Sequence, residues 1–283
     1  MIKYSALVRF FANFQDGFIM KKFKNFLINF NFNNRHTPFQ KTKKYYLNKK
    51  YFIENFYFNI YDFSNVDQLL YFEYEKNHFK FYLNSFLSDE IFIDIGSNIG
   101  THSFFILKYL NPSKVLSIDP QKICIYLQKK TLSTNKDLNK EKIEFINSAV
   151  GDFPSELKLF RSNSGSATLA NDFGSDSVDL FNIEKHNISN ISIEDIFKKL
   201  SKKLVTIKID VQGSEEKILD GIYNSNSLIN IKNIIFEINN TNMDVLKIVI
   251  QKYLNKYKLI DLNYNEISIL EIEKHRDLVL SKI

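Results

Sequence analysis

The sequence predicts an α/β fold with a mostly parallel, doubly wound sheet, and three observations support this prediction. From Asp89 onward, short runs rich in β-branched residues alternate with stretches of helical periodicity. Three of these runs are almost wholly apolar, as expected for strands that helices cover on both faces. A turn that contains glycines follows the first run, at the point where a parallel strand would pass into a helix.

The elements of this fold can be placed in chain order. We expect parallel strands at Ile91–Ile95, Val115–Ile118, Ile143–Ile146, Val205–Ile209 and Ile234–Ile238. Helices are expected between them at about 100–110, 122–135, 215–224 and 243–257, followed by a strand pair near 258–262 and 268–273. Residues 156–170 alternate on either side of a turn at Gly165, which predicts a β-hairpin insertion between the third and fourth strands.

The charge distribution divides the chain near residue 88. Residues 1–50 hold 11 Lys or Arg and one acid, Asp16, a charge of 11 − 1 = +10, whereas the other residues hold 27 basic and 31 acidic side chains, a charge of −4. The sequence pI near 9.0 therefore arises from the N-terminal region alone. We expect residues 1–88 to form a basic, aromatic, helical extension that contacts substrate or a surface, and residues 89–283 to form the α/β domain.

The N-terminal region predicts one amphipathic helix. Its apolar face consists of Ile19, Phe23, Phe26, Leu27 and Phe30, with lysines on the opposite face. Two interpretations stay open: the helix packs on its own domain, or it rests on an anionic membrane surface or a partner through residues 1–50. No nucleic-acid-binding motif accompanies the basic charge, so nucleic acid is not an expected partner.

Composition excludes several classes of protein. One cysteine, Cys124, excludes a disulfide framework and fits a reducing compartment. No run of about 18 uncharged apolar residues predicts a spanning helix, and the N-terminus lacks the pattern of a secretory signal. We therefore expect a cytoplasmic protein, with a peripheral location at the inner face of the membrane as an alternative.

The segment Asp94–His102 follows the first strand and opens a helix. Such a turn presents backbone N–H groups to a ligand, and glycine lets the backbone turn and approach closely. Asp119 ends the next strand, 23 residues after Gly96, where an acid binds ribose hydroxyls in doubly wound folds. Together these features predict a cofactor that contains a nucleoside.

Two further strand ends carry acids. Asp152 follows the third strand and could accept a hydrogen bond from an adenine amino group, or it could be a turn residue beside Gly151. Asp210 ends a buried apolar strand, where a carboxylate must be paired or must face the cleft. Lys208 lies two residues earlier on the same face, so both a site role and structural pairing stay open for Asp210.

Six motifs follow one another along the chain: Phe92-Ile93-Asp94-Ile95-Gly96-Ser97-Asn98-Ile99-Gly100, Ile118-Asp119-Pro120, Ala149-Val150-Gly151-Asp152, Ser192-Ile193-Glu194-Asp195-Ile196, Ile207-Lys208-Ile209-Asp210-Val211-Gln212-Gly213-Ser214-Glu215 and Ile235-Phe236-Glu237-Ile238. In this order they resemble the FkbM family of S-adenosylmethionine-dependent methyltransferases. The resemblance runs from about Asp89 to Ile238 and implies a Rossmann-like class I methyltransferase fold, with methyl transfer to a hydroxyl oxygen on a sugar, surface glycan or secondary metabolite.

The resemblance also implies which residues bind S-adenosylmethionine. Asp94, Gly96 and Asn98 would hold its methionine part, Asp119 its ribose, and Asp152 with its neighbours its adenine. The full cofactor-binding set is Asp94, Gly96, Ser97, Asn98, Gly100, Thr101, Asp119, Pro120, Ala149 and Asp152. The chain departs from the family at Gln212, where the family usually has Glu, and at Asp119, where the family more often has Glu.

Methyl transfer to oxygen needs a group that removes or orients the acceptor proton. Asp210 is the first candidate, His102 at the start of the first helix is the second, and Glu237 at the end of the fifth strand is the third. His102 has an alternative reading as a histidine that only covers the loop. No metal is predicted, because acids that are close in sequence on one turn do not make a ligand set.

Two other classes stay open beside a methyltransferase with a small-molecule or glycan acceptor. The first is an NAD-binding oxidoreductase, which shares the loop and the ribose acid, although no catalytic Tyr/Lys or His/Asp pair is recognisable. The second is a non-catalytic protein with a methyltransferase fold that acts in a glycan-assembly or membrane-surface complex.

Overall fold

The computed structural model describes ten segments of the chain. They are residues 49–53, 56–60, 75–151, 158–161, 167–168, 183–185, 189–200, 202–225, 229–238 and 242–283. The predicted helix at 19–30, Asp152 and the turn at Gly165 lie outside these residues.

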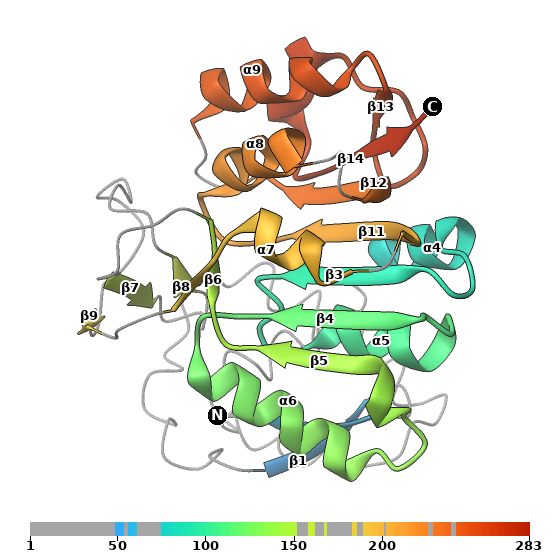
Figure 1. Ribbon diagram of the computed structural model, residues 1–283, viewed down its shortest axis with the longest axis vertical. Helices are drawn as coiled ribbons and strands as arrows, with labels where there is room; N and C mark the ends of the chain where they lie inside the picture. Colours follow the sequence, from blue (N-terminus) through green and yellow to red (C-terminus); the bar gives the residue numbers. More distant parts are fainter. Residues whose placement is uncertain are drawn as a thin grey trace, which may run out of the picture.

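A seven-stranded sheet forms the centre of the protein, in the order β13-β14-β12-β11-β3-β4-β5 (Figure 1). The five strands from β12 to β5 are parallel, whereas β14 runs antiparallel to both of its neighbours. This confirms the predicted mostly parallel, doubly wound sheet and all five predicted parallel strands. Their bounds are β3 Ile91–Ile95, β4 Lys114–Ile118, β5 Ile143–Ile146, β11 Leu204–Ile209, β12 Asn230–Glu237, β13 Tyr257–Ile260 and β14 Asp277–Lys282.

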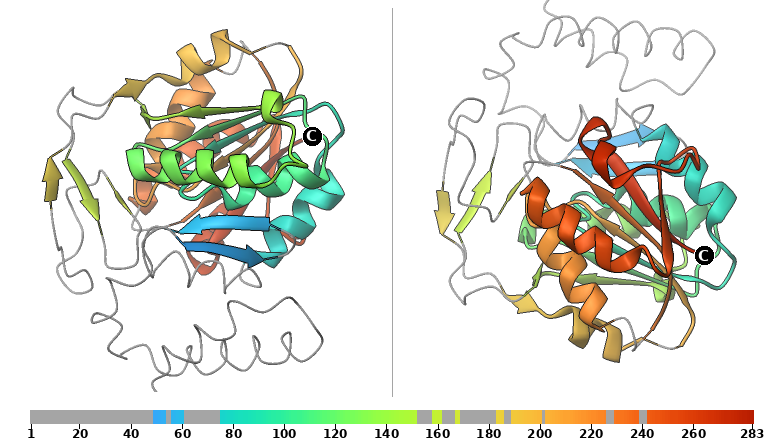
Figure 2. Two further views of the ribbon diagram at one scale, coloured as in Figure 1. Left: turned by 90° about the horizontal axis from the view of Figure 1, so that it is seen from below. Right: turned by 90° about the horizontal axis from the view of Figure 1, so that it is seen from above.

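Helices cover both faces of the sheet (Figures 1 and 2). The apolar residues of α4, α5 and α6 pack in one buried cluster, and those of α7, α8 and α9 pack in another. Because side chains alternate along a strand, Phe92 of β3 enters the first cluster and Ile93 enters the second. The helices are α4 Lys76–Ser85, α5 Thr101–Tyr109, α6 Lys122–Thr134, α7 Ile193–Lys198, α8 Glu215–Ser225 and α9 Met243–Tyr253.

The same alternation gathers polar residues on the face covered by α4, α5 and α6. Asp94 of β3 is the register partner of Lys208 on β11, so their side chains lie on the same face of the sheet. Two residues further along, Asp210 follows β11, and Glu237 at the end of β12 is the register partner of Asp277 on β14. The carboxyl ends of the parallel strands thus carry a row of charged residues, at the edge where open α/β sheets bind ligands.

The predicted final strand at 268–273 is wrong. Residues Ile269–Lys274 form a 3-10 helix, η4, because the Ser268 hydroxyl accepts a hydrogen bond from the backbone N–H of Leu270 and caps the turn. The last strand is instead β14, which inserts between β12 and β13. The helix predicted over 243–257 ends at Tyr253, and Tyr257 already begins β13.

Smaller elements surround the sheet. In the insertion, β7 (Lys158–Arg161) and β8 (Ala167–Thr168) pair antiparallel, which confirms the predicted hairpin strands, and β9 (Ile183–Lys185) adds a third strand. β6 (Ala149–Val150) and β10 (Asn190–Ile191) form a short parallel pair.

The described part of residues 1–88 contains both strand and helix. An unpredicted hairpin of β1 (Lys49–Ile53) and β2 (Phe56–Ile60) lies beside α6 (Figure 2). Helix α4 buries Phe79, Phe81 and Tyr82 against the sheet. None of the helices described is both long and apolar enough to cross a membrane.

Candidate active site

The loop after β3 approaches the loop after β11 very closely. Gly96 has a φ of 81°, in the left-handed region, and a Cβ atom there would lie 1.8 Å from the backbone oxygen of Asp210. The backbone N–H of Asp210 in turn donates to the carbonyl of Ile95. Glycine at position 96 therefore allows two loops that carry predicted site residues to meet.

Backbone N–H groups of this loop bind the neighbouring strand end. The N–H groups of Gly96 and Ser97 both donate to the carbonyl of Ile118, and the N–H of Asn98 donates to Oδ2 of Asp119 over 2.8 Å. The sequence predicted that such groups face a ligand, whereas these three fix the loop to the end of β4.

Asp119 is buried and holds two segments of backbone. Its Oδ1 accepts a hydrogen bond from the N–H of Gln121 over 2.8 Å, while its Oδ2 accepts the bond from Asn98. Burial raises the pKa of Asp119 to about 7, against these two backbone donors. The side chain of Asn147 donates to the carbonyl groups of both Asp119 and Pro120, so the turn after β4 is also fixed.

Asp94 is fully buried, and only one of its two carboxylate oxygens has hydrogen-bond partners. Its Oδ2 accepts hydrogen bonds from the backbone N–H and the hydroxyl of Ser103, at 3.2 and 2.7 Å. Its Oδ1 has no hydrogen-bond partner among the residues described. A buried carboxylate oxygen without a partner is costly, so this atom fits a cationic or hydrogen-bond-donating group of a ligand.

A buried polar network supports the loop from behind. The Ser103 and Ser117 hydroxyl oxygens lie 3.0 Å apart, and Ser117 donates to Oε1 of Gln128 over 2.6 Å. Nε2 of Gln128 donates to Oγ of Ser97 and to the carbonyl of Asn98, at 2.9 and 2.6 Å. Gln128, which the sequence analysis missed, therefore joins the loop to α6.

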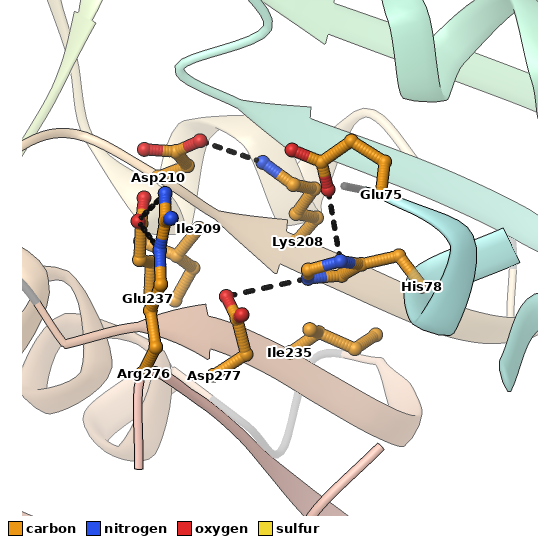
Figure 3. A pocket seen from close by; sticks show the side chains of 9 residues that line it. All are labelled: Glu75, His78, Lys208, Ile209, Asp210, Ile235, Glu237, Arg276 and Asp277. Carbon is orange, nitrogen blue, oxygen red and sulfur yellow. Dashed lines mark hydrogen bonds and ion pairs between the residues drawn. The ribbon is translucent and has the colours of Figure 1, made fainter. Parts of the chain in front are cut away.

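A charged pocket opens beside the ends of β11 and β12 (Figure 3). Asp210 contributes its carboxylate, with Oδ2 3.1 Å from Nζ of Lys208 and Oδ1 accepting from Nε2 of Gln212 over 2.7 Å. The pocket is lined by Glu75, His78, Lys208, Ile209, Asp210, Ile235, Glu237, Arg276 and Asp277.

Asp210 and Lys208 keep each other charged. Burial opposes the ionised form of Asp210, but the Lys208 ammonium, Glu237 and Gln212 outweigh burial and hold the Asp210 pKa below its usual value. Burial likewise opposes the charge of Lys208, and Asp210 with Asp94 raises the Lys208 pKa above its usual value. The pair is ionised at neutral pH.

Glu237 differs from Asp210 in its protonation. Burial and the neighbouring Asp210 carboxylate raise the pKa of Glu237 to about 10, although Arg276 lies against its Oε1 from the exposed side. Gln212 also donates to Glu237 Oε2 over 3.3 Å. Because the Asp210 carboxylate disfavours a second negative charge beside it, the proton resides on Glu237 at neutral pH.

His102, on α5, lies beside Glu75 of this pocket. Its Nδ1 lies 3.1 Å from the hydroxyl of Tyr82, and its Nε2 lies 3.4 Å from Oε2 of Glu75. Burial and the Lys208 charge lower the pKa of His102, so its ring is neutral. Burial raises the pKa of Tyr82, which stays protonated and donates to Nδ1.

His78 connects α4 to β14 beside His102. Its Nδ1 lies 2.9 Å from Oε2 of Glu75 and its Nε2 lies 3.4 Å from Oδ1 of Asp277. Burial lowers the pKa of His78, but the two carboxylates outweigh burial and raise it to about 9. His78 is therefore an imidazolium between two acids.

Glu75, His78, Arg276 and Asp277 were not predicted as site residues. The Glu75–His78 spacing of three residues on a helix was a usable signal, and Asp277 directly precedes an apolar run. Both signals lie outside the strand-end motifs from which the site was predicted.

The structure brings most predicted site residues to one edge of the sheet. Asp94, Gly96, Asp119 and Asp210 lie on adjacent strand ends, and Glu237 follows on the next. Thr101 begins α5, Ala149 begins β6, and Gly100 caps α5 in the left-handed conformation.

Glu215, the acid that follows Ser214 after β11, has structural partners. Glu215 accepts hydrogen bonds from the backbone N–H groups of Val211 and Gly213 and so holds the turn after β11. Among the described residues, no three or more His, Cys, Asp or Glu side chains are arranged to hold a metal ion.

Comparison with solved structures gives distant similarities. Methyltransferase FkbM from Methylobacillus flagellatus KT is 16% identical with a TM-score of 0.44, over 68% of this chain and 43% of that one. SMU.1697c from Streptococcus mutans, in complex with SAH, is 11% identical with a TM-score of 0.41, over 74% and 97% of the two chains. An rRNA methylase from Streptococcus thermophilus is 14% identical with a TM-score of 0.39, over 75% and 96%. All three TM-scores are below 0.5, so these similarities are weak.

A family model gives the decisive comparison. No curated protein matches the chain. The model of the methyltransferase FkbM domain matches residues 94–258, more than half of the 283 residues, and includes the loop after β3, Asp119, Asp210 and Glu237. The chain therefore belongs to the FkbM methyltransferase domain family, with S-adenosylmethionine as its cofactor.

Proposed function

We propose that the protein transfers a methyl group from S-adenosylmethionine to a hydroxyl oxygen of a sugar, surface glycan or secondary metabolite, with Asp210 as the base. One observation carries this proposal: the Asp210 carboxylate is ionised and lies in the charged pocket beside the loop after β3. Its side chain is 29% exposed, against 9% for His102 and 6% for Glu237. Of the three candidates, Asp210 is the most accessible to an acceptor.

The other two candidates are less suited to accept a proton. The lone pair of His102 Nδ1 is used by the Tyr82 hydroxyl, and its Nε2 faces the Glu75 carboxylate. Glu237 already carries a proton at neutral pH and is covered by Arg276. Of the three candidates, Asp210 is both ionised and exposed to an acceptor in the pocket.

The residues of the loop after β3 suit the cofactor. When bound, S-adenosylmethionine supplies a methyl group on a sulfonium centre that an acceptor oxygen can attack. Asp94 would hold the amino group of its methionine part with the unpartnered Oδ1. Asp119 would accept bonds from ribose hydroxyls through the lone pairs that Asn98 and Gln121 leave unused.

The lining of the pocket favours a polar acceptor. Seven of the nine lining residues are titratable and the other two are isoleucines. Such a surface offers many donors and acceptors to a molecule rich in hydroxyl groups, and little apolar area to a flat aromatic one.

Two measurements test the proposal. Calorimetry with S-adenosylmethionine, S-adenosylhomocysteine and NAD should show binding of the first two, whereas binding of NAD alone would favour an oxidoreductase. Transfer of labelled methyl groups should then be assayed on monosaccharides, glycans, hydroxylated metabolites and RNA. Label in a hydroxylated small molecule or glycan is the expected result, and label in RNA would contradict the proposed acceptor class.

A control variant distinguishes the loss of a site carboxylate from the general effect of removing one negative charge. Asp137 is an exposed carboxylate paired with Lys108 on the outside of the protein. Asp137→Asn should bind and transfer like the unmodified protein, whereas Asp94→Asn should weaken cofactor binding. Cofactor binding without transfer to any acceptor class would favour a non-catalytic binding protein.

We also propose that residues 1–50 contact an anionic membrane surface. Their charge of 11 − 1 = +10 and the apolar helix face that the sequence predicts at 19–30 support the proposal. Flotation with anionic vesicles at low salt should recover the protein, and high salt should release it. Absence of binding at low salt would leave packing on the protein itself as the better interpretation.

A further inference from the structure

Two side chains hold the Asp210 carboxylate by its two oxygens. Lys208, two residues earlier on β11, lies with Nζ 3.1 Å from Oδ2. Gln212, two residues later, donates from Nε2 to Oδ1 over 2.7 Å. Lys208 shares the face of Asp210 because side chains alternate along the strand.

The position of Gln212 needs an unusual backbone conformation. Its φ is 60°, in the left-handed region that residues with side chains seldom adopt. In this conformation its amide nitrogen lies between two carboxyl groups, 2.7 Å from Asp210 Oδ1 and 3.3 Å from Glu237 Oε2. An amide nitrogen carries two hydrogens, so one group can donate to both acids.

Lys208 has a different part in the arrangement. Its ammonium is buried, so its charge acts on Asp210 with little screening by solvent. It forms an ion pair with Asp210 and not with Asp94, its register partner on β3. Oδ1 of Asp94 has no hydrogen-bond partner among the residues described, so this oxygen is available to a ligand.

We propose that Lys208 and Gln212 are positioning residues for methyl transfer, which hold Asp210 ionised and in one orientation. This inference rests on the proposed role of Asp210. Lys208, Gln212 and Glu237 use three of the four lone pairs on the carboxylate oxygens, which leaves one for the acceptor hydroxyl. As the acceptor O–CH₃ bond forms and the S–CH₃ bond breaks, the hydroxyl proton moves to Asp210, and the donor leaves as a neutral thioether.

Titration of Asp210 tests the arrangement without an acceptor. The full chain, labelled with ¹³C at the aspartate carboxyl carbons and saturated with S-adenosylhomocysteine, is titrated by NMR, and Asp210→Asn identifies the signal. In Lys208→Met the midpoint should move upward by about one pH unit or more, because an adjacent opposite charge is lost. Lys208→Arg should restore most of the shift.

Gln212→Met keeps the length of the side chain and removes the donor, so the midpoint should again rise, by a smaller amount. Lys203→Met is the control, because Lys203 pairs with Asp89 on the outside of the protein and its loss should leave the midpoint unchanged.

Two results would overturn the inference. One is an unshifted Asp210 midpoint in a folded Lys208→Met variant, and the other is an unshifted midpoint in Gln212→Met, which decides the matter if Lys208→Met does not fold. Failure of the proposed function is seen separately, as full methyl transfer by Asp210→Asn. With an acceptor from the panel, the low-pH limb of kcat should move upward in Lys208→Met while the KM for S-adenosylmethionine stays unchanged.

Discussion

The backbone N–H of Asn98 donates to Oδ2 of Asp119 over 2.8 Å and so joins the loop after β3 to the end of β4. Asp119 is therefore both a support of the loop and the proposed acceptor for ribose hydroxyls. Because burial raises the Asp119 pKa to about 7, the charge of this support changes near neutral pH.

Cofactor affinity should depend on pH through Asp119. An ionised carboxylate accepts hydrogen bonds from hydroxyls better than a protonated one, and with a pKa of about 7 Asp119 is mostly protonated at pH 6 and mostly ionised at pH 8. Affinity for S-adenosylhomocysteine should rise about tenfold over this interval. Calorimetry at pH 6, 7 and 8 measures it, and Asp119→Asn should remove the dependence. Equal pH dependence in both proteins would rule out Asp119 as its source.

Two glycine substitutions should have opposite effects on stability. In Gly96→Ala the new Cβ would overlap the backbone oxygen of Asp210, so the free energy of unfolding should fall by more than about 1 kcal/mol and cofactor affinity should fall with it. In Gly221→Ala, within α8, the new Cβ would lie 3.5 Å from Ile193, an ordinary contact. That change should stabilise the protein by about 0.5–1 kcal/mol. Urea unfolding compares them, and an unchanged Gly96→Ala variant would contradict the close approach of the two loops.

Asp210→Asn should separate catalysis from stability. The substitution keeps the shape of the side chain and removes the charge, so methyl transfer should fall by roughly 10²- to 10⁴-fold while cofactor binding stays near normal. Turnover and melting temperature should both be measured on the same preparation. If the pair with Lys208 is only structural, the variant will instead lose thermal stability and keep its turnover per folded molecule.

His78 should make stability fall in alkaline solution. Its folded pKa is raised to about 9 from an ordinary value near 6.5, so its stabilisation is complete below about pH 6.5 and is lost between pH 6.5 and 9. The shift corresponds to about 3 kcal/mol. Asp119 and Glu237 also titrate, so the quantity to measure is the difference between the unmodified protein and His78→Gln in urea unfolding at each pH. A difference that does not shrink from pH 6 to pH 9 would refute the assignment of charge to His78.

The sequence predicted the parallel sheet because its signals are local. The apolar runs of β3 and β11 and the acids at their ends, Asp94 and Asp210, can each be read within a few residues. Parallel strands bring their carboxyl ends to the same edge of a sheet, and this does not depend on how the side chains pack. The row of charged residues at that edge could therefore be predicted from the order of the elements.

The rest of the site depends on pairing between distant segments. Nε2 of His78 and Oδ1 of Asp277 lie 3.4 Å apart, but these residues belong to α4 and β14, which are far apart in the sequence. β14 itself was missed because residues 268–273 alternate like a strand, and the Ser268 cap that makes them a 3-10 helix is a weak signal. The loop N–H groups were misjudged because Ile118 and Asp119, which accept from them, belong to the next strand.

The position of β14 has a consequence for biosynthesis. It is the seventh strand of the sheet in chain order, yet it occupies an interior place between β12 and β13. While the ribosome is still making residues before 277, the nascent chain presents an unpaired edge of β12, the kind of edge that invites pairing with other chains. The same residues bring Arg276 and Asp277 to the pocket, so an incompletely translated product lacks both a closed sheet and part of its charged pocket.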